Sequence, residues 1–307
     1  MQTSLAYRIA LCGVLFVWSV SSSQSRAQTT PTVDRPIQYL SDKKIQGTDS
    51  VLVPGATLLI GEVHGTWETP ILVATLVRRA VVEDTETILC IEVSSSEQAS
   101  LDRFLSSDGG TEAKRTLLKQ PHWTNQDGRA SVGMFALLEL MRRLRSEGKK
   151  IQIIAMDANW NVPEADIASL SPEKLRQLEE LANKRDHEMA KAVIKAREGA
   201  AEALIIAYAG NVHTRVIKGT AWDPNYIPMG WYISQKLKNV VSLDADYASG
   251  QAWVTTERGS GPTKFGGKDQ GPIPFVKMFE NAESGYNGTL YVGRTTAAEP
   301  AAGKNGG

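Results

Sequence analysis

Two short motifs of the form Gly-x-x-His carry the residue types best suited to chemistry in this chain of 307 residues. They are Gly-Glu-Val-His at residues 61–64 and Gly-Asn-Val-His at residues 210–213, and each follows an apolar run typical of a buried strand. The chain has only four histidines, so two in the same context indicate a shared role. Because residues two apart in a strand point the same way, we expect Glu62 beside His64 and Asn211 beside His213.

Further charged residues are predicted to converge on the same place. Glu92 and Asp157 each end an apolar strand, and an acid in such surroundings needs a partner. The long helix expected after residue 171 has an apolar stripe at i, i+3/i+4 spacing, and Arg185 falls on that stripe. Its guanidinium therefore needs a buried carboxylate, for which Glu62, Glu92 and Asp157 are the candidates.

Two imidazoles beside carboxylates are suited to hydrolysis, with or without a metal. His64, His213 and Glu62 are the expected ligands of Zn²⁺, Mn²⁺ or Co²⁺, with one position left open for a water. The metal would lower the pKa of that water and polarise the scissile carbonyl. In the metal-free alternative, His64 is held by Glu62 and activates water directly. In either scheme Glu92 orients a ligand or acts as a general base, and Arg185 holds a carboxylate or stabilises the oxyanion.

The elements that must position these residues alternate along the chain. Apolar runs predict strands at residues 57–60, 87–93, 151–156, 204–209 and 240–244, with later strands at 251–255 and 289–292. Helical patterns fill the intervals, at residues 69–83, 101–105, 131–147, 171–198 and 230–238. This alternation predicts an α/β fold with a central mostly parallel or mixed sheet, helices on both faces and two repeated strand–Gly-x-x-His units. Ligands of such sheets bind outside the carboxyl ends of the strands.

Residues 106–130 are polar and irregular, and we expect them to form an insertion or a lid. Trp123 and the region 222–231 supply aromatic side chains that could form the walls of a pocket. With Asn211 and Asp157 at strand ends, Trp123 and Arg129 are the candidate substrate-binding residues. The expected partner is a small molecule or a peptide.

The first residues have the order of a secretory signal. Arg8 precedes a short apolar run at residues 9–20, and small residues lead to a cleavage site after Ala27. We therefore expect a signal peptide at 1–27, a flexible lead-in at 28–50, a single domain at 51–294 and a disordered tail at 295–307. The mature protein would be periplasmic or secreted, with no remaining stretch apolar enough to span a membrane.

Composition excludes some classes of function and structure. Lys and Arg together balance Asp and Glu at a net charge of +0, which gives no electrostatic basis for binding nucleic acid. Only Cys90 would remain after cleavage, so no disulfide framework is expected. Its apolar neighbours indicate a core residue.

The motifs resemble one superfamily. The residues that carry the resemblance are the two Gly-x-x-His motifs, the acid that ends the second strand, Arg185-Asp186 with Met189-Ala190, and Asp127-Gly128-Arg129 before the helix at 131–144. The superfamily includes the ChaN-like haem-uptake lipoproteins, the TIKI and TraB proteases and the erythromycin esterases. The resemblance covers residues 52–246.

This resemblance implies a fold in which the two motifs meet, with Glu62, His64, Glu92 and His213 lining the site and Arg185 nearby. It implies a hydrolase of ester or peptide bonds, because several members of the superfamily have such activities. It also keeps two alternatives open, a haem or iron-compound binding protein and a binding module without catalytic activity. Haem needs an axial Tyr or His, and the candidates are Tyr208, Tyr226, Tyr232, Tyr247 and His122.

Overall fold

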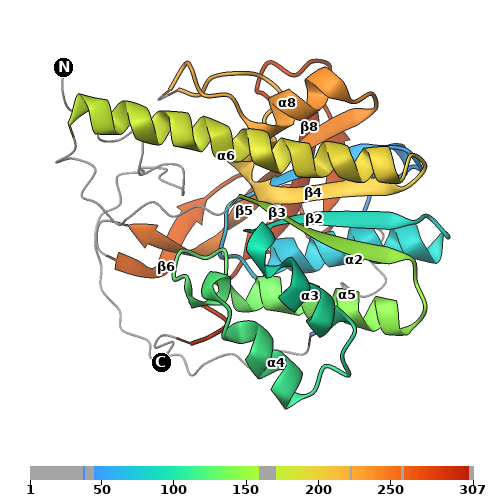
Figure 1. Cartoon of the computed structure of the whole chain (residues 1–307). Helices are drawn as coiled ribbons and strands as arrows, with labels where there is room; N and C mark the ends of the chain where they lie inside the picture. Colours follow the sequence, from blue (N-terminus) through green and yellow to red (C-terminus); the bar gives the residue numbers. More distant parts are fainter. Residues whose placement is uncertain (1–36, 39–44, 159–170, 222, 257–258, 304–307) are drawn as a thin grey trace.

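A mixed sheet organises the chain (Figure 1). The computed structural model describes residues 37–38, 45–158, 171–221, 223–256 and 259–303. The expected leader at 1–27, most of the lead-in at 28–50 and Trp222 lie outside them. The strands are β1 (Thr57–Glu62), β2 (Thr87–Ser94), β3 (Ile151–Asp157), β4 (Leu204–Gly210), β5 (Val240–Thr256), β6 (Gly259–Gly266), β7 (Phe275–Met278) and β8 (Gly288–Thr295).

The strand order places the predicted motifs on neighbouring strands. The eight-stranded sheet has the order β3-β2-β4-β1-β5-β8-β7, and β6 pairs with β5 outside this path. The pairs from β3 through to β8 are parallel, whereas β5–β6 and β7–β8 are antiparallel. In β1 and β4, Gly61 pairs with Ala209 and Glu62 with Gly210. The mostly parallel mixed sheet confirms the predicted fold class.

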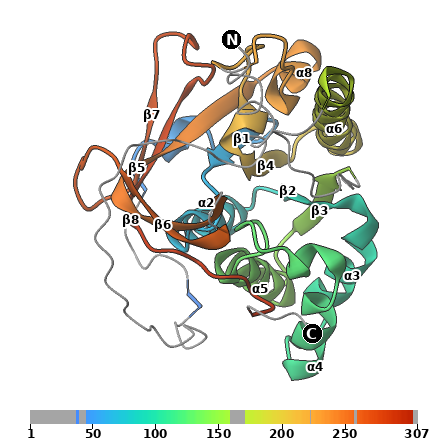
Figure 2. The same ribbon diagram turned by 90° about the vertical axis from the view of Figure 1, so that its left-hand side faces the viewer.

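Helices cover both faces of the sheet (Figure 2). On one side lie α2 (Glu68–Val82), α3 (Gln98–Leu105) and α5 (Val132–Ser146), and on the other lie α6 (Pro172–Gly199) and α8 (Met229–Lys236). The alternation of side chains along a strand divides the core accordingly. Leu58 and Ile60 of β1 pack on the first side, whereas Leu59 packs on the second.

Local signals explain where the long helices begin. Ser131 caps α5, because its hydroxyl accepts a hydrogen bond from the backbone N–H of Met134 at 3.3 Å. Ser171 caps α6 in the same way, and Pro172 occupies its first turn. Both starts agree with the prediction from the sequence. Helix α2 begins at Glu68, one residue before the expected Thr69.

Three expected features differ in the structure. His213 lies on the short helix α7 (Asn211–Thr214), not on an extended strand. Residues 251–255 are the distal part of the long strand β5, which continues past the sheet centre to pair with β6. Residues 106–130 contain helix α4 (Thr111–Leu118) and the 3-10 turn η4 (Pro121–Thr124), so much of this segment is regular.

The expected disordered tail is also wrong for residues 295–303. Ala298 is fully buried, and its backbone N–H donates to the carbonyl of Gly65 at 2.8 Å. Isolated bridges join Ala297 to Thr66 and Pro300 to Ser131. The segment therefore connects the loop after β1 with the start of α5.

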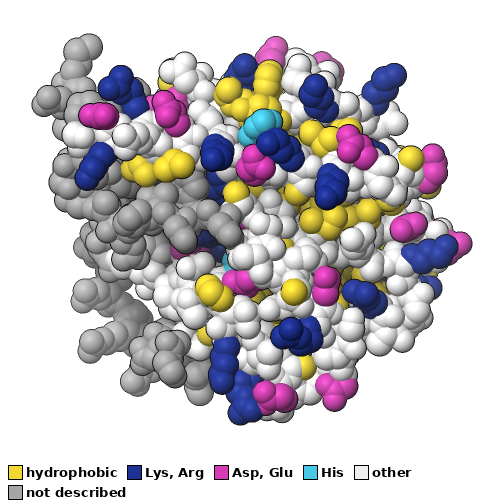
Figure 3. All heavy atoms as spheres, viewed as in Figure 1, with side chains coloured by type: hydrophobic (Ala, Val, Ile, Leu, Met, Phe, Trp, Pro, Cys, Tyr) yellow, Lys and Arg dark blue, Asp and Glu magenta, His cyan; other side chains and the backbone are white. Residues whose placement is uncertain are grey.

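Three further features of the described residues complete the fold. Within it, no helix combines the length and the apolarity needed to cross a membrane. Cys90 lies in β2 with no exposed surface, and burial raises the pKa of its thiol to about 12. Acidic and basic side chains are interspersed over the described part of the face in Figure 3.

Candidate functional site

The carboxyl ends of four neighbouring strands bring the predicted residues together. Asp157 ends β3, Glu92 lies near the end of β2, Gly210 ends β4 and Glu62 ends β1. Because these strands are parallel, their ends meet at one edge of the sheet. The acids are nearly inaccessible, as are the histidines that follow β1 and β4. We call this group, completed by Arg185 and Asp186 of α6, the histidine cluster.

His64 and Glu62 form a close pair. The Nδ1 atom of His64 lies 2.9 Å from Oε1 of Glu62. The second oxygen of Glu62 accepts a hydrogen bond from the hydroxyl of Tyr208. Glu62 is thus held by two partners, and it orients the imidazole so that Nε2 points to the centre of the cluster.

Glu92 occupies that centre. Its Oε2 atom accepts a hydrogen bond from the backbone N–H of Gly210 at 2.8 Å and lies 3.3 Å from Nε2 of His64. Its Oε1 atom accepts from Nη2 of Arg185 at 2.6 Å. A Cβ atom at position 210 would lie 2.9 Å from Nε2 of His64, so the absence of a side chain there permits the close approach.

Arg185 links the acids to the second histidine. Its Nε and Nη2 atoms each donate to Asp157 at 2.7 Å, which is a bidentate ion pair. Its Nη1 atom lies 3.2 Å from Nε2 of His213. A guanidinium can only donate, so Nε2 of His213 accepts and the ring proton lies on Nδ1.

The Nδ1 atom of His213 faces Asp186, at 2.9 Å from Oδ1. Asp186 also accepts from the hydroxyl of Tyr226 at 2.8 Å and from the backbone N–H of Met229 at 2.7 Å. Asp186 was not among the predicted site residues, although its position next to Arg185 on a helix was a usable signal. Tyr208 and Tyr226 gave no such signal, because their partners are distant in sequence.

The charges in the cluster shift the titration of its members. Burial alone would lower the pKa of His64, but Glu92 and Glu62 outweigh burial and raise the pKa to about 10. Burial alone would raise the pKa of Glu92, but the nearby cations His64 and Arg185 hold it well below its usual range. Burial raises the pKa of Glu62. At neutral pH, therefore, His64 carries a proton and Glu92 is ionised.

Arg129 and Asp127 lie beside the cluster, on its more accessible side. Nε of Arg129 donates to Asp127 at 2.8 Å, and Nη1 lies 3.7 Å from Glu92. The side chains of Arg129 and Asp127 keep 23% and 31% of their surface exposed, far more than any member of the cluster. Among the described residues of the site, these two side chains have the most exposed surface.

The loops that carry His64 and Arg129 meet at Trp253 of β5. Gly65 and Gly128 have φ angles of 76° and 90°, and a Cβ atom at either would come within 2.3 Å of the Trp253 carbonyl oxygen. The indole N–H of Trp253 donates to the carbonyl of Gln126 at 3.0 Å. Glycine is therefore required at both positions.

Two candidate substrate-binding residues lie elsewhere. Asn211 begins α7 and does not share a face with His213, because residues two apart in a helix diverge. Its carbonyl accepts from the hydroxyl of Tyr286 at 2.8 Å. Trp123 is fully buried and packs edge-on against Phe135, with ring centroids 6.2 Å apart, so it is a core residue and forms no pocket wall.

The expected metal ligands are not arranged to hold an ion. Within the described residues, no group of three or more His, Cys, Asp or Glu side chains has a geometry suited to a metal. The reason is visible in the contacts of the cluster. Glu62 faces the Nδ1 side of His64, away from His213, and the guanidinium of Arg185 donates to Nε2 of His213. A cation supplied by the protein thus lies where the metal was expected.

The candidate haem ligands are largely engaged as well. The hydroxyl groups of Tyr208 and Tyr226 donate to Glu62 and Asp186, and that of Tyr247 accepts from the backbone N–H of Val63 at 3.0 Å. Tyr232 packs on the ring of His187, with centroids 4.7 Å apart. Three of the four tyrosines would have to give up a buried hydrogen bond to ligate iron, so these three do not fit haem as they stand. The remaining candidate, His122, is buried, and its Nε2 atom has no hydrogen-bond partner among the described residues.

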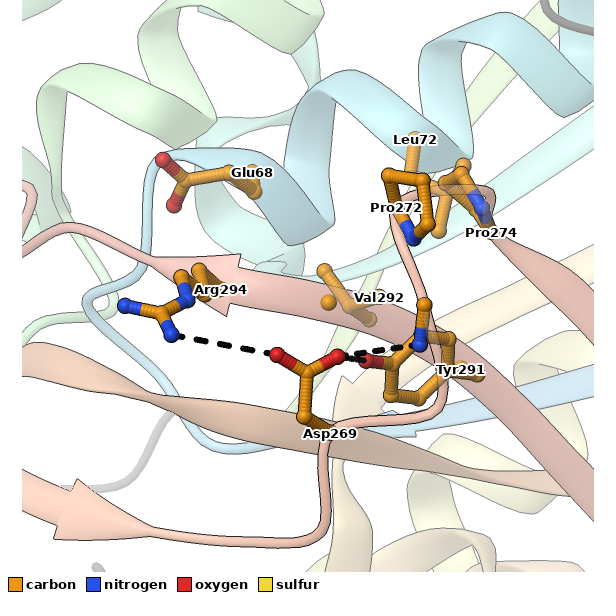
Figure 4. Close-up of a pocket in the computed structure, with 10 residues that line it drawn as sticks. Glu68, Leu72, Asp269, Pro272, Pro274, Tyr291, Val292 and Arg294 are labelled. Atoms are coloured by element: carbon orange, nitrogen blue, oxygen red, sulfur yellow. Dashed lines mark hydrogen bonds and ion pairs between the residues drawn. The ribbon is translucent and has the colours of Figure 1, made fainter.

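A separate pocket of about 740 Å³ lies between α2 and the β7–β8 region (Figure 4). Leu72, Val292 and Tyr291 contribute apolar surface, while Asp269 and Arg294 face each other across it at 3.8 Å. None of its lining residues belongs to the histidine cluster. The pocket contains no histidine, so it offers no comparable chemistry.

Comparison with known proteins identifies the fold. No protein-family model matches the sequence, and curated proteins give no match to it either. A crystal structure of a Bacillus cereus protein aligns with a TM-score of 0.59 at 12% identity, covering 82% of this chain and 91% of that one. The two chains therefore share a fold.

Two weaker matches correspond to the branches named by the sequence resemblance. A mutant erythromycin esterase in its open conformation aligns with a TM-score of 0.48 at 14% identity, covering 80% of this chain and 77% of that one. Haem-bound ChaN of Campylobacter jejuni aligns with a TM-score of 0.38 at 18% identity, covering 67% and 88%. Similarity at this level carries no information about activity, and the fold assignment rests on the Bacillus cereus structure instead.

Proposed function

We propose that this protein is a hydrolase of ester or peptide bonds that uses His64 and Glu92 as its proton-transferring pair, without a metal. The observation that carries the proposal is the position of His64 between two buried carboxylates. Glu62 lies 2.9 Å from Nδ1 and Glu92 lies 3.3 Å from Nε2. Burying charged groups is costly. A histidine buried between two carboxylates is therefore not expected in a core whose only role is stability.

The proton positions suggest how the pair would act. Glu92 is ionised and takes a proton from a water molecule, which attacks the carbonyl carbon of the substrate. His64 carries a proton and donates it from Nε2 to the leaving group as the carbon–heteroatom bond breaks. Glu92 then returns its proton to His64 across the 3.3 Å contact, which restores the starting state.

The two residues influence each other in a way that favours this cycle. Glu92 is the group that most strongly raises the pKa of His64. When Glu92 takes a proton from water, that influence disappears and His64 becomes a stronger acid toward the leaving group. Such pairs titrate together, so the pH profile of the reaction will report values that belong to the pair.

The arginines divide the remaining roles. Arg185 is bound to Asp157, Glu92 and His213. Of its two expected roles, holding a carboxylate and stabilising the oxyanion, we assign it the first. Arg129 lies on the accessible side, 3.7 Å from Glu92, and its guanidinium is suited to stabilising negative charge that develops on the substrate carbonyl oxygen.

The test is hydrolysis of p-nitrophenyl acetate, p-nitrophenyl butyrate and peptide p-nitroanilides in the presence of a chelator. We expect activity, and we expect His64→Gln and Glu92→Gln each to lower kcat by about a hundredfold or more. His187→Gln is the matched control, because His187 is an exposed histidine on α6 outside the cluster. It should leave kcat within about twofold of the unmodified protein, as surface substitutions usually do.

Three results would contradict the proposal. The first is absence of hydrolysis from every substrate while the protein is folded. The second is activity that is lost in a chelator and restored by Zn²⁺, Mn²⁺ or Co²⁺, which would support the metal-dependent mechanism instead. The third is a stoichiometric Soret band on adding haem that Tyr208→Phe or Tyr226→Phe abolishes.

A further inference from the structure

We propose that the pocket between α2 and β8 is a ligand site of its own, which binds an apolar α-amino acid with a free ammonium group and a free carboxylate. The inference goes beyond the proposed hydrolase function and does not depend on it, because no residue that lines the pocket belongs to the histidine cluster. It rests on the size of the cavity, on its apolar wall and on two opposite charges beside that wall (Figure 4).

The pocket has the size and the lining of a small-molecule site. Its volume of about 740 Å³ lies in the range of roughly 300–1,000 Å³ that is usual for such sites. Leu72, Pro274 and Val292 line it and are themselves buried, so they form an apolar wall that is continuous with the core. An aromatic or a large aliphatic side chain of a ligand would bury apolar surface against this wall.

Asp269 is held in place and keeps one oxygen available. Its Oδ1 atom accepts hydrogen bonds from the backbone N–H of Gly271 at 2.9 Å and from the hydroxyl of Tyr291 at 3.4 Å. The same hydroxyl accepts from the backbone N–H of Gln270 at 2.9 Å, which fixes the loop that carries Asp269. Among the described residues, the nearest cation to Oδ2 is Arg294, at 3.8 Å. Oδ2 is therefore open to a donor from a ligand.

Arg294 is the complementary cation. Its guanidinium lies beyond hydrogen-bonding distance of Asp269, and it has no hydrogen-bond partner within the part of the chain that the structure describes. Glu68 is the third charged residue of the lining, but its two oxygens accept from the backbone N–H and the hydroxyl of Thr296, at 2.7 and 2.8 Å. The donors of Arg294 are thus available to a carboxylate from a ligand.

Two opposite charges this close together match the head of an α-amino acid, whose ammonium and carboxylate groups share one carbon atom. The ammonium group would donate to Oδ2 of Asp269, and Arg294 would donate to the carboxylate, so that both contacts are charge-assisted. The side chain then lies against the apolar wall. Because a zwitterion has no net charge, the additional carboxylate of Glu68 does not repel it. A longer peptide carries its terminal charges on different residues and does not match.

L-Tryptophan is the probe, because its side chain is large and apolar. NMR of the ¹⁵N-labelled protein follows the amide signals of Gly271 and Gly293, which line the pocket. We expect these signals to shift on titration with L-tryptophan, with a Kd of about 1 mM or lower. N-acetyl-L-tryptophan lacks the ammonium group and tryptamine lacks the carboxylate. We expect each to bind about tenfold more weakly, the effect of one lost charge-assisted hydrogen bond.

Two substitutions assign each charge of the ligand to its partner. Arg294→Gln should weaken the binding of L-tryptophan about tenfold without weakening that of tryptamine, which has no carboxylate to lose. Asp269→Asn should weaken L-tryptophan about tenfold without weakening N-acetyl-L-tryptophan, which has no ammonium group. Arg115→Gln is the matched control, because Arg115 is an exposed arginine on α4 with a surface ion pair to Glu112. It should bind L-tryptophan as the unmodified protein does.

Three results would overturn the inference. One is the absence of any shift of the Gly271 and Gly293 signals at about 10 mM L-tryptophan. Another is an equal affinity for L-tryptophan and both analogues, since the two charges would then not be recognised. The last is an equal loss of affinity in Arg115→Gln and Arg294→Gln. Hydrolysis plays no part in these measurements, so failure of the proposed function and failure of this inference are distinguishable.

Discussion

At the scale of single residues, the two histidines of the paired motifs use their ring nitrogens differently. His213 accepts from Arg185 at one nitrogen and faces Asp186 at the other, so its tautomer is fixed. His64 lies between two acids and carries a proton that it can give away. The sequence repeats Gly-x-x-His, but in the folded protein only His64 lies between two acids, and the proposed mechanism uses only His64 for proton transfer.

Asp186→Asn tests the fixed tautomer of His213. Asp186 accepts from the Met229 N–H with Oδ1 and from the Tyr226 hydroxyl with Oδ2. An asparagine whose oxygen keeps the Met229 bond would therefore turn its N–H group toward the Tyr226 hydroxyl and Nδ1 of His213, which lies 3.0 Å from Oδ2. The ring proton would then move to Nε2, against the donor of Arg185. We expect a loss of about 1–3 kcal/mol in urea unfolding, because a buried donor is left unpaired. The ¹⁵N shifts of His213 should report the changed tautomer.

Glu188→Gln is the control for that substitution. Glu188 lies two residues further along α6, with 41% of its side chain exposed and a surface ion pair to Lys191. Its loss should change stability by less than about 1 kcal/mol. Equal effects of the two substitutions would contradict the assignment of the fixed His213 tautomer to Asp186.

The pH dependence of stability tests the charge on His64. Its pKa is raised from 6.5 in the unfolded chain to about 10 in the folded protein. The stabilisation is therefore complete below pH 6.5 and is lost as the pH rises through 10. We expect the free energy of unfolding to fall by roughly a few kcal/mol over this interval. His64→Gln should flatten the plot of unfolding free energy against pH over this interval. An unchanged slope would show that His64 is not the group that loses the proton.

At the scale of elements, the site depends on how the strands end. The sequence predicted that Glu62, Glu92 and Asp157 would meet, because the carboxyl ends of parallel strands lie at one edge. It failed for Asn211, because the chain turns into α7 immediately after Gly210, and two-residue periodicity ends where the strand ends. The partners Tyr208 and Tyr226 could not be found, since side-chain distances between elements leave no mark in a local pattern.

Gly210→Ala tests the close contact of β4 with the proton-transferring pair. The added methyl group would lie 2.9 Å from Nε2 of His64 and 3.6 Å from Oε2 of Glu92, so one of them must shift. We expect kcat to fall about tenfold to a hundredfold, because small displacements of reacting groups are costly. Gly199→Ala, where the methyl group meets nothing within 4 Å, is the matched control. Equal activities would show that the contact has no role in the reaction.

At the scale of the whole molecule, the fold class followed from near-continuous apolar strands alternating with helices, and the structure bears it out. For the segment after β8, by contrast, the prediction from the sequence was wrong. Its small residues and prolines suggested disorder, yet the backbone of residues 296–301 pairs with the loop after β1 and with the start of α5. Backbone hydrogen bonds do not depend on side-chain type, so composition could not reveal them.

Removing residues 295–307 tests the contribution of this segment. The truncation deletes hydrogen bonds to Trp67, Gly65, Val132 and Ala130, which hold the loops on either side of the site. We expect a loss of roughly 2–5 kcal/mol in the free energy of unfolding, the sum expected for several backbone bonds, together with lower activity. Removing only residues 304–307 is the control and should change neither. If the longer truncation had the same free energy of unfolding as the full chain, these contacts would make no contribution to stability.

The in-register pairing of β1 with β4 limits where the chain tolerates insertions. Glu62 lies opposite Gly210, so adding one residue within either strand would move its half of the site by about 3.3 Å and turn every later side chain to the opposite face. The junction between Thr256 of β5 and Gly259 of β6 carries no such constraint, because no residue of the histidine cluster comes from the ends of these strands. Reporter peptides or affinity tags inserted between Thr256 and Gly259 should therefore leave hydrolysis intact, while a single alanine inserted in β1 should abolish it.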